Sequence, residues 1–195
     1  EGIDGAGKST QIAVVANALR GRELPVVITR EPGGTAVGEA LREVILHQPM
    51  GIGTETLLMF AARAEHLERV IRPALDAGTW VLCDRFTDAT YAYQSGGRGM
   101  SAEHIGELEQ WVHPDLQPDL TLLFDVPPDV AAQRLARARS ADRFEAEQVD
   151  FFARVRNAYL ERARAEPQRF IVIDGTQPAE VIGARLDELM QRWNG

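Results

Sequence analysis

Four residues near the start of the chain have the types and the spacing that bind a phosphate group. Gly2, Gly7, Lys8 and Ser9 fit the pattern G-x-x-x-x-G-K-[ST] without a mismatch. In this pattern the glycines let backbone N–H groups turn toward a phosphate, the lysine adds a positive charge, and the serine hydroxyl ligates Mg²⁺. A helix that begins here also directs its positive end at the phosphate. The residues expected to bind the phosphates of ATP are Gly2, Ile3, Asp4, Gly5, Ala6, Gly7, Lys8, Ser9 and Thr10.

An aspartate and several arginines have the chemistry that the rest of such a site requires. Asp84 follows the apolar run 80–83, and a carboxylate at the carboxyl end of a core strand can hold Mg²⁺ through water. The alternative for Asp84 is a helix N-cap. Guanidinium groups grip oxyanions with paired hydrogen bonds, so arginines at the ends of different elements can converge on a second anion. These arginines are Arg30, Arg42, Arg63 and Arg85.

A second group of arginines falls within ten residues. Arg134, Arg137, Arg139 and Arg143 would repel one another unless an anion joins them. A lid that closes on the ATP phosphates would use such charges to stabilise the phosphoryl group during transfer. We therefore expect a lid over residues 134–145, with a solvated helix as the alternative.

The elements that position these residues alternate along the chain. Nearly continuous apolar runs predict strands at 24–29, 79–84, 120–125 and 170–174. Amphipathic stretches predict helices at 11–20, 54–77, 145–165 and 178–193. This alternation predicts an open α/β sheet with right-handed crossovers. Segments 95–100 and 135–144 are expected as loops that line a site.

The phosphate loop also requires a buried strand directly before it. Such a loop follows the carboxyl end of a buried strand, whereas this sequence begins at Glu1. We expect several apolar residues upstream of Glu1 to form that strand. Without them the sheet would keep an open slot.

Composition limits the class of protein. The 195 residues carry a formal charge of −8 and are 45% hydrophobic, which suits one domain with a substantial core. The negative charge argues against a protein that coats nucleic acid or an anionic membrane. Cys83 is the only cysteine and the four histidines lack ligand spacing, which excludes a disulfide framework. No apolar run approaches the about 20 residues of a membrane span, and a cytoplasmic location is expected.

Several strings together resemble the thymidylate kinase family. They are the phosphate loop at 1–10, TREPGGT at 29–35, FAAR at 60–63, DRF at 84–86, AYQ at 92–94, GGRG at 96–99 and DRFE at 142–145. The phosphate loop alone is generic, but the strings at 29–35 and 84–86 together are specific. The resemblance covers the whole chain apart from the expected first strand.

This resemblance implies both a fold and an activity. The fold is a single P-loop NTPase-type domain, a doubly wound parallel sheet of about five strands with helices on both faces, usually paired as a homodimer. The activity is Mg²⁺-dependent transfer of the γ-phosphoryl group of ATP to dTMP, which gives dTDP and ADP in dTTP biosynthesis.

The resemblance also assigns residues to the phosphate and sugar of dTMP. Arg63 and Arg85 would hold the phosphate, with Arg30 nearby. Asp4 would accept a hydrogen bond from the 3′-hydroxyl group. Tyr93 would crowd the 2′ position and so disfavour ribonucleotides.

The resemblance assigns a separate set of residues to the base of dTMP. Phe60 would stack on thymine, although Met59 occupies the position that carries the stacking phenylalanine in some relatives. Arg42, Thr90 and Gln94 would read the polar edge of the base.

For catalysis, the resemblance points to the lid. Gly5 follows Asp4 in the phosphate loop, where some relatives place a basic residue, so the lid arginines would supply the catalytic cations. The expected catalytic residues are Lys8, Arg85, Arg139 and Arg143, and the expected metal ligands are Ser9 and Asp84. Residues 174–177 are expected near adenine from their position alone.

Three other functions remain open on the residues themselves. The first is a kinase for another monophosphate or for a nucleoside. The second is a nucleotide-dependent switch, which needs a residue that orients water; Arg85 stands directly after Asp84, where no such Gln or Glu is found. The third, an inactive nucleotide-binding scaffold, is disfavoured by the intact phosphate loop.

Overall fold

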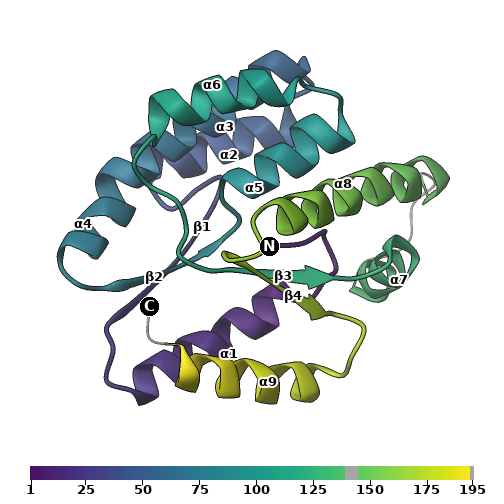
Figure 1. Cartoon of the computed structure of the whole chain (residues 1–195). Helices are drawn as coiled ribbons and strands as arrows, with labels where there is room; N and C mark the ends of the chain where they lie inside the picture. The colour runs from purple at the N-terminus through teal and green to yellow at the C-terminus, as the bar shows by residue number, and fades with distance from the viewer. Residues whose placement is uncertain (139–144, 194–195) are drawn as a thin grey trace.

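The computed structural model describes the backbone of residues 1–138 and 145–193 (Figure 1). The strands are β1 (Val26–Arg30), β2 (Trp80–Asp84), β3 (Thr121–Asp125) and β4 (Phe170–Asp174). The α-helices are α1 (Lys8–Gly21), α2 (Ala36–His47), α3 (Ile52–His66), α4 (Arg72–Asp76), α5 (Thr87–Thr90), α6 (Ala102–Val112), α7 (Pro128–Ala138), α8 (Glu145–Ala165) and α9 (Ala179–Arg192). Two π-helical segments are η1 (Leu67–Ile71) and η2 (Tyr91–Gly97).

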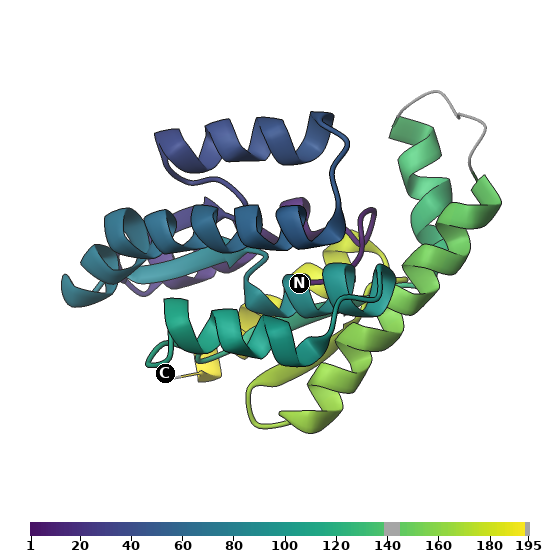
Figure 2. The ribbon, with the colours of Figure 1, turned by 90° about the horizontal axis from the view of Figure 1, so that it is seen from above.

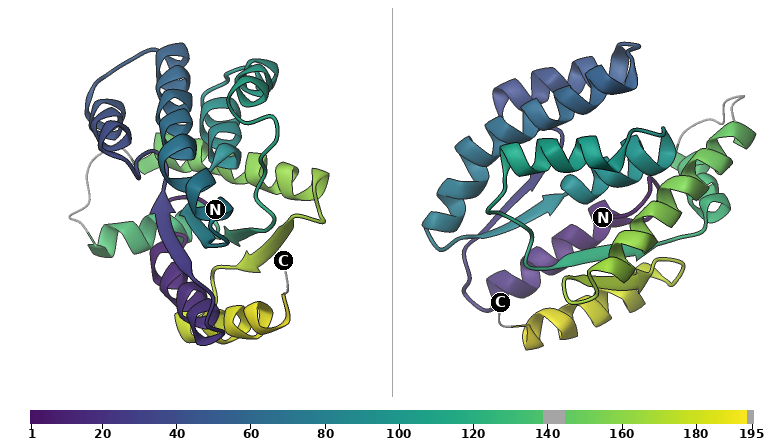
Figure 3. Two further views of the ribbon diagram at one scale, coloured as in Figure 1. Left: turned by 90° about the vertical axis from the view of Figure 1, so that its left-hand side faces the viewer. Right: turned by 45° about the horizontal axis from the view of Figure 1, so that its top comes forward.

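The four strands form two parallel pairs. β1 pairs with β2 so that Arg30 lies opposite Asp84, and β3 pairs with β4 so that Asp125 lies opposite Asp174. Helices α1 and α9 pack together below the strands, while α2, α3, α6 and α8 lie above them (Figures 1 and 3). At one end of the molecule α7 packs against α8 (Figure 2). The described residues thus form an α/β fold with helices on both faces.

A gap separates the two strand pairs. A cavity of about 450 Å³ lies between β2 and β3, lined by apolar side chains that include Trp80, Leu82, Leu120 and Leu122. Glu1 already pairs with β3, because its backbone nitrogen donates to the carbonyl oxygen of Leu122 at 2.8 Å. The two strand pairs are not hydrogen-bonded to each other, and the strand expected upstream of Glu1 stays a prediction.

A main core joins most of the elements, and a smaller cluster of Leu67, Ile71 and Phe86 lies apart from it. The main core includes Leu19 of α1, Leu123 of β3, Val155 of α8 and Leu186 of α9, all at most 2% exposed. Their burial follows from the apolar runs of the strands and the apolar faces of the helices. Within the described residues, no helix is long and apolar enough to cross a membrane.

The predicted strands and the helices at 145–165 and 178–193 are confirmed within two residues, and the first helix begins three residues earlier than predicted, but other elements differ. The helix expected at 54–77 is α3, η1 and α4 in succession, with the π-turn directly before Pro73. The helices α2, α6 and α7 were not among the predicted elements. The prediction of a loop at 95–100 was wrong in part, because residues 95–97 lie in η2. Likewise residues 135–138 form the end of α7, and residues 139–144 lie outside the described part of the chain.

Candidate active site

The phosphate loop requires glycine for steric reasons. Gly2 has a φ of 128°, and a Cβ atom there would lie 2.5 Å from the carbonyl oxygen of Phe124. Gly5 has a φ of 83°, and its Cβ atom would lie 2.6 Å from the carbonyl oxygen of Ala131. L-residues with side chains rarely adopt such angles. Only glycine at these two positions therefore lets the loop pack so closely against β3 and α7.

Lys8 lies inside the loop at the start of α1. Its Nζ atom donates to the carbonyl oxygens of Gly2 and Ile3, at 3.0 and 3.1 Å. Burial, together with the positive charge of Arg85, lowers the pKa of Lys8 to about 8. The ammonium group thus braces the loop and lies close to the second cation of the site.

Two possible metal ligands lie beside the loop. Ser9 is exposed. The Oδ1 atom of Asp84 is buried and has no hydrogen-bond partner among the described residues. An oxygen of this kind suits a hard divalent cation or its bound water.

Arg85 follows Asp84 in a left-handed conformation with a φ of 72°. Its Nη2 atom donates to Asp4 Oδ1 at 2.8 Å and to the Tyr93 hydroxyl at 2.9 Å. Its guanidinium lies 4.6 Å from the centre of the Tyr93 ring. Burial raises the pKa of Tyr93 to about 12, so the hydroxyl keeps its proton. The structure therefore brings Asp4, Arg85 and Tyr93 together, and their roles toward dTMP stay predictions.

The turn is supported by the carboxylate of Glu1 and the hydroxyl of Tyr159, which were not predicted from the sequence. Glu1 accepts a hydrogen bond from the backbone nitrogen of Phe86 at 2.6 Å and another from the Tyr159 hydroxyl at 2.8 Å. Tyr159 in turn accepts from Arg85 Nη1 at 3.3 Å. The sequence offered no local signal, because Tyr159 lies on an apolar helix face 158 residues from Glu1.

Arg63 is held on three sides. Its Nε atom donates to Glu31 Oε2 at 2.7 Å, and its Nη2 atom donates to Thr90 Oγ1 at 3.1 Å. The rings of Phe60 and Phe86 lie 4.7 and 5.1 Å from the guanidinium carbon. The Nη1 atom is buried without a partner among the described residues. Because an unpaired buried donor is costly, this N–H group is suited to receive an oxyanion.

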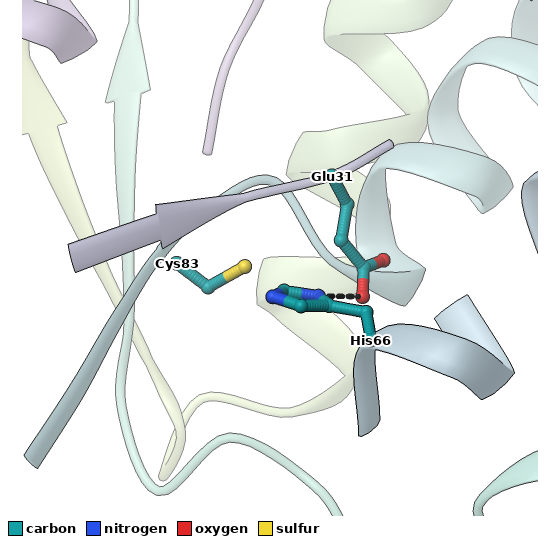
Figure 4. A group of neighbouring side chains, drawn as sticks. All are labelled: Glu31, His66 and Cys83. Atoms are coloured by element: carbon teal, nitrogen blue, oxygen red, sulfur yellow. Dashed lines mark hydrogen bonds and ion pairs between the residues drawn. The ribbon is translucent and has the colours of Figure 1, made fainter. Parts of the chain in front are cut away.

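Glu31, which pairs with Arg63, also belongs to a largely buried cluster with His66 and Cys83 (Figure 4). His66 bonds through Nδ1 to Glu31 Oε1 at 3.0 Å and through Nε2 to Thr29 Oγ1 at 2.6 Å. Ligand atoms of Glu31, His66 and Cys83 lie within 4.8 Å of one another. However, both imidazole nitrogens already have partners, Cys83 Sγ donates to the Arg85 carbonyl oxygen, and burial raises the pKa of the thiol well above its usual value. The cluster is therefore satisfied by hydrogen bonds without a metal ion.

Among the residues expected to bind the base, Gln94 and Thr90 contact side chains of α3. Gln94 Nε2 donates to Glu55 Oε1 at 2.9 Å, and Glu55 also forms an ion pair with Arg98. Thr90 is buried against Arg63. Phe60 is also buried, between Arg63 and the ring of His113, which leaves little of its face for a base. Met59 is only half-buried.

Two predicted arginines lie apart from these contacts. Arg30 donates to Glu39 Oε2 at 2.8 Å, and Arg42 donates to the Pro32 carbonyl oxygen at 2.9 Å. No described hydrogen bond joins either of them to Arg63 or Arg85. The catalytic candidates Arg139 and Arg143 lie outside the described residues.

A phosphate loop before α1 in an α/β fold with parallel strands defines a P-loop NTPase-type nucleotide-binding protein. The profile of the family described as thymidylate kinase matches residues 1–186. The thymidylate kinase of Methylobacillus flagellatus is 58% identical over 193 residues, 99% of this chain and 95% of the relative. That of Bordetella pertussis is 62% identical over 187 residues, 96% of this chain and 90% of the relative. The chain belongs to the thymidylate kinase family, whose members are nucleoside monophosphate kinases.

Proposed function

We propose that this chain transfers the γ-phosphoryl group of ATP to dTMP, producing dTDP and ADP for dTTP synthesis. The observation that carries the proposal is Arg63, whose Nη1 atom is buried without a partner among the described residues and whose guanidinium lies 5.1 Å from the ring of Phe86, the residue after Arg85. An arrangement with two anion sites, one at the loop and one at these arginines, suits transfer between two phosphates. Family membership supplies dTMP as the acceptor.

In this proposal the chain acts by positioning and by electrostatic stabilisation. Lys8 and the loop amides bind the β- and γ-phosphates, and Arg63 and Arg85 hold the phosphate of dTMP. No general base is required, because an acceptor phosphate oxygen is ionised at neutral pH. Arg139 and Arg143 are proposed to close over the phosphoryl group during transfer.

Mg²⁺ fits the donors present. The exposed Ser9 hydroxyl and the unpartnered Asp84 Oδ1 atom are hard oxygen ligands, and they would hold the ion directly or through water. When bound, Mg²⁺ neutralises charge on the ATP phosphates.

The same arrangement supports a choice of residues for the sugar and the base of dTMP. Asp4 stays exposed enough to accept a hydrogen bond from a 3′-hydroxyl while Arg85 orients it. Tyr93 places a rigid ring beside the sugar. Since Phe60 is buried, we propose that Met59 packs on the base instead.

A substrate panel tests the function. Purified enzyme with ATP and Mg²⁺ is assayed for ADP formation with dTMP, dUMP, dCMP, dGMP and AMP. We expect dTMP to give the highest kcat/KM and ATP alone to give negligible ADP. Preferred turnover of another monophosphate would replace dTMP as the substrate, and rapid hydrolysis without acceptor would favour a nucleotide-dependent switch.

We also propose a homodimer formed through helices. Large exposed apolar residues lie on three neighbouring helices: Leu46 on α2, Leu57 on α3 and Trp111, which is 80% exposed, on α6 (Figure 1). Burial of such side chains is a usual reason for association. The main core supports one domain over the described residues. A lid at 134–145 is proposed from its arginines, and a cytoplasmic location is proposed because ATP and dTMP are found there.

A further inference from the structure

We infer that Tyr159 is a positioning residue for the acceptor phosphate, because its hydroxyl group holds the guanidinium of Arg85 in one orientation. The inference rests on the proposed function, since it takes the phosphate of a nucleoside monophosphate as the ligand of Arg85. It gives a part in substrate binding to a buried residue of α8 that lies outside the sequence motifs.

The hydroxyl group of Tyr159 bridges two groups of opposite charge. It accepts a hydrogen bond from Arg85 Nη1 at 3.3 Å and donates one to Glu1 Oε2 at 2.8 Å. The direction of both bonds is fixed, because a guanidinium only donates and an ionised carboxylate only accepts. Burial raises the pKa of the Tyr159 hydroxyl well above its usual value, so the bridging proton stays in place. Tyr159 therefore connects Arg85 to Glu1 as a neutral bridge.

Glu1 gives this bridge a firm support, because its other oxygen atom is bound to the backbone. Glu1 Oε1 accepts from the backbone nitrogen of Phe86 at 2.6 Å. Phe86 directly follows Arg85, whose backbone has a φ of 72°. One carboxylate thus holds the turn twice, once directly through the backbone and once through the side chain by way of Tyr159.

The ring of Tyr159 is itself fixed in place. The residue is 1% exposed and belongs to the main core. Its ring packs edge-to-face against that of Tyr93, with the ring centres 6.4 Å apart. A group that is already ordered loses little further freedom when it orients a neighbour. The hydroxyl group is therefore a rigid anchor for Arg85.

The bridge leaves Arg85 able to bind an anion. Its Nη2 atom donates to Asp4 and Tyr93, and its Nη1 atom donates to Tyr159. A guanidinium has five N–H groups, so these three bonds leave two for an oxyanion, and the side chain stays 17% exposed. A direct contact with Glu1 would instead place a second carboxylate, besides Asp4, against a group that must attract phosphate. The neutral hydroxyl group orients the guanidinium without that added negative charge.

Thymidine and dTMP distinguish an effect on the phosphate site from a general defect, because they differ only in the phosphate group. The Kd of each is measured by calorimetry for the unmodified protein and for Tyr159→Phe, which removes the hydroxyl group and keeps the ring. We expect the Kd for dTMP to rise by about tenfold or more, because Arg85 is no longer oriented. The Kd for thymidine and the KM for ATP should stay nearly unchanged. A defect of the fold weakens both ligands together.

A double-mutant cycle tests whether Tyr159 acts through Arg85. Arg85→Ala alone should weaken dTMP binding, and the addition of Tyr159→Phe should weaken it no further, because the group to be oriented is gone. Tyr91→Phe is the matched control. The Tyr91 hydroxyl also donates to a glutamate, Glu109 Oε2 at 2.7 Å, and no described hydrogen bond joins it to Arg85. This control should keep the ratio of the two Kd values.

The outcomes separate the inference from the proposed function. An unchanged ratio of the two Kd values in Tyr159→Phe, or a further loss of dTMP affinity in the double variant, overturns the inference. Should Tyr159→Phe fail to fold, Glu1→Gln is judged by the same ratio, because its amide cannot accept from both Phe86 and Tyr159. An unmodified protein that binds thymidine as tightly as dTMP overturns the proposed function instead.

Discussion

The buried ion pair between Glu31 and Arg63 yields the sharpest prediction about stability. The two side chains are 4% and 2% exposed, and Glu31 is also bonded to His66. Glu31→Ala leaves the guanidinium of Arg63 without its carboxylate and the Nδ1 atom of His66 without its partner. Removal of one member of a buried pair costs about 3–5 kcal/mol, which corresponds to a fall in Tm of about 6–20 °C for a domain of this size.

The assay is urea unfolding followed by circular dichroism at neutral pH, with Tm measured in parallel. Glu31→Gln keeps an acceptor in nearly the same place, and its free energy of unfolding should lie between those of the unmodified protein and Glu31→Ala. The matched control is Glu39→Ala, which breaks an ion pair with Arg30 whose side chains are 42% and 53% exposed. Because solvent screens such a pair, this variant should lose less than about 1 kcal/mol. Equal losses for the buried and the exposed glutamate would refute the reasoning.

Three further predictions concern ATP, the metal and assembly. Burial lowers the pKa of Lys8 to about 8, and the side chain attracts phosphate only when it is protonated. The affinity for ATP, measured by calorimetry, should therefore fall as the pH rises above 8. A constant affinity from pH 7 to 9.5 would contradict this role. Asp84→Asn should raise the Mg²⁺ concentration for half-maximal activity by about 10–100-fold, whereas an unchanged Mg²⁺ requirement would exclude this aspartate as a metal-holding group. Trp111→Glu should convert the proposed dimer to a monomer in light scattering coupled to size-exclusion chromatography. A monomeric unmodified protein, or a dimeric variant, would argue against an interface at α6.

Local patterns explain which parts could be predicted from the sequence. The phosphate loop and the strands depend on short-range spacing and on runs of apolar residues, so they can be read directly. Helix α2 was missed because its face is exposed: Gly38 is its only buried residue. The arginine-rich segment was assigned to a loop on charge repulsion alone, yet residues 135–138 continue α7.

The supporting residues of the site could not be predicted in this way. Glu31, Glu55 and Glu1 act on partners that are 32, 39 and 158 residues away in the sequence. The local sequence around a glutamate does not indicate so distant a partner, because only the fold brings the two residues together. The burial of Phe60 is another such case, because an aromatic residue on a helix face suits a core as well as a binding surface.

The π-helical segment η2 has a consequence for how this site could change over time. A π-turn holds one residue more than an α-turn, and η2 carries Tyr93 and Gln94 in its length. Loss of one residue from η2 would let this segment take ordinary α form, with its backbone still hydrogen-bonded, while side chains within the segment turn by up to about 100°. Gln94 would then turn away from α3. Substrate preference in this fold is therefore exposed to single-residue deletions, and a length variant could acquire a new acceptor in one evolutionary step.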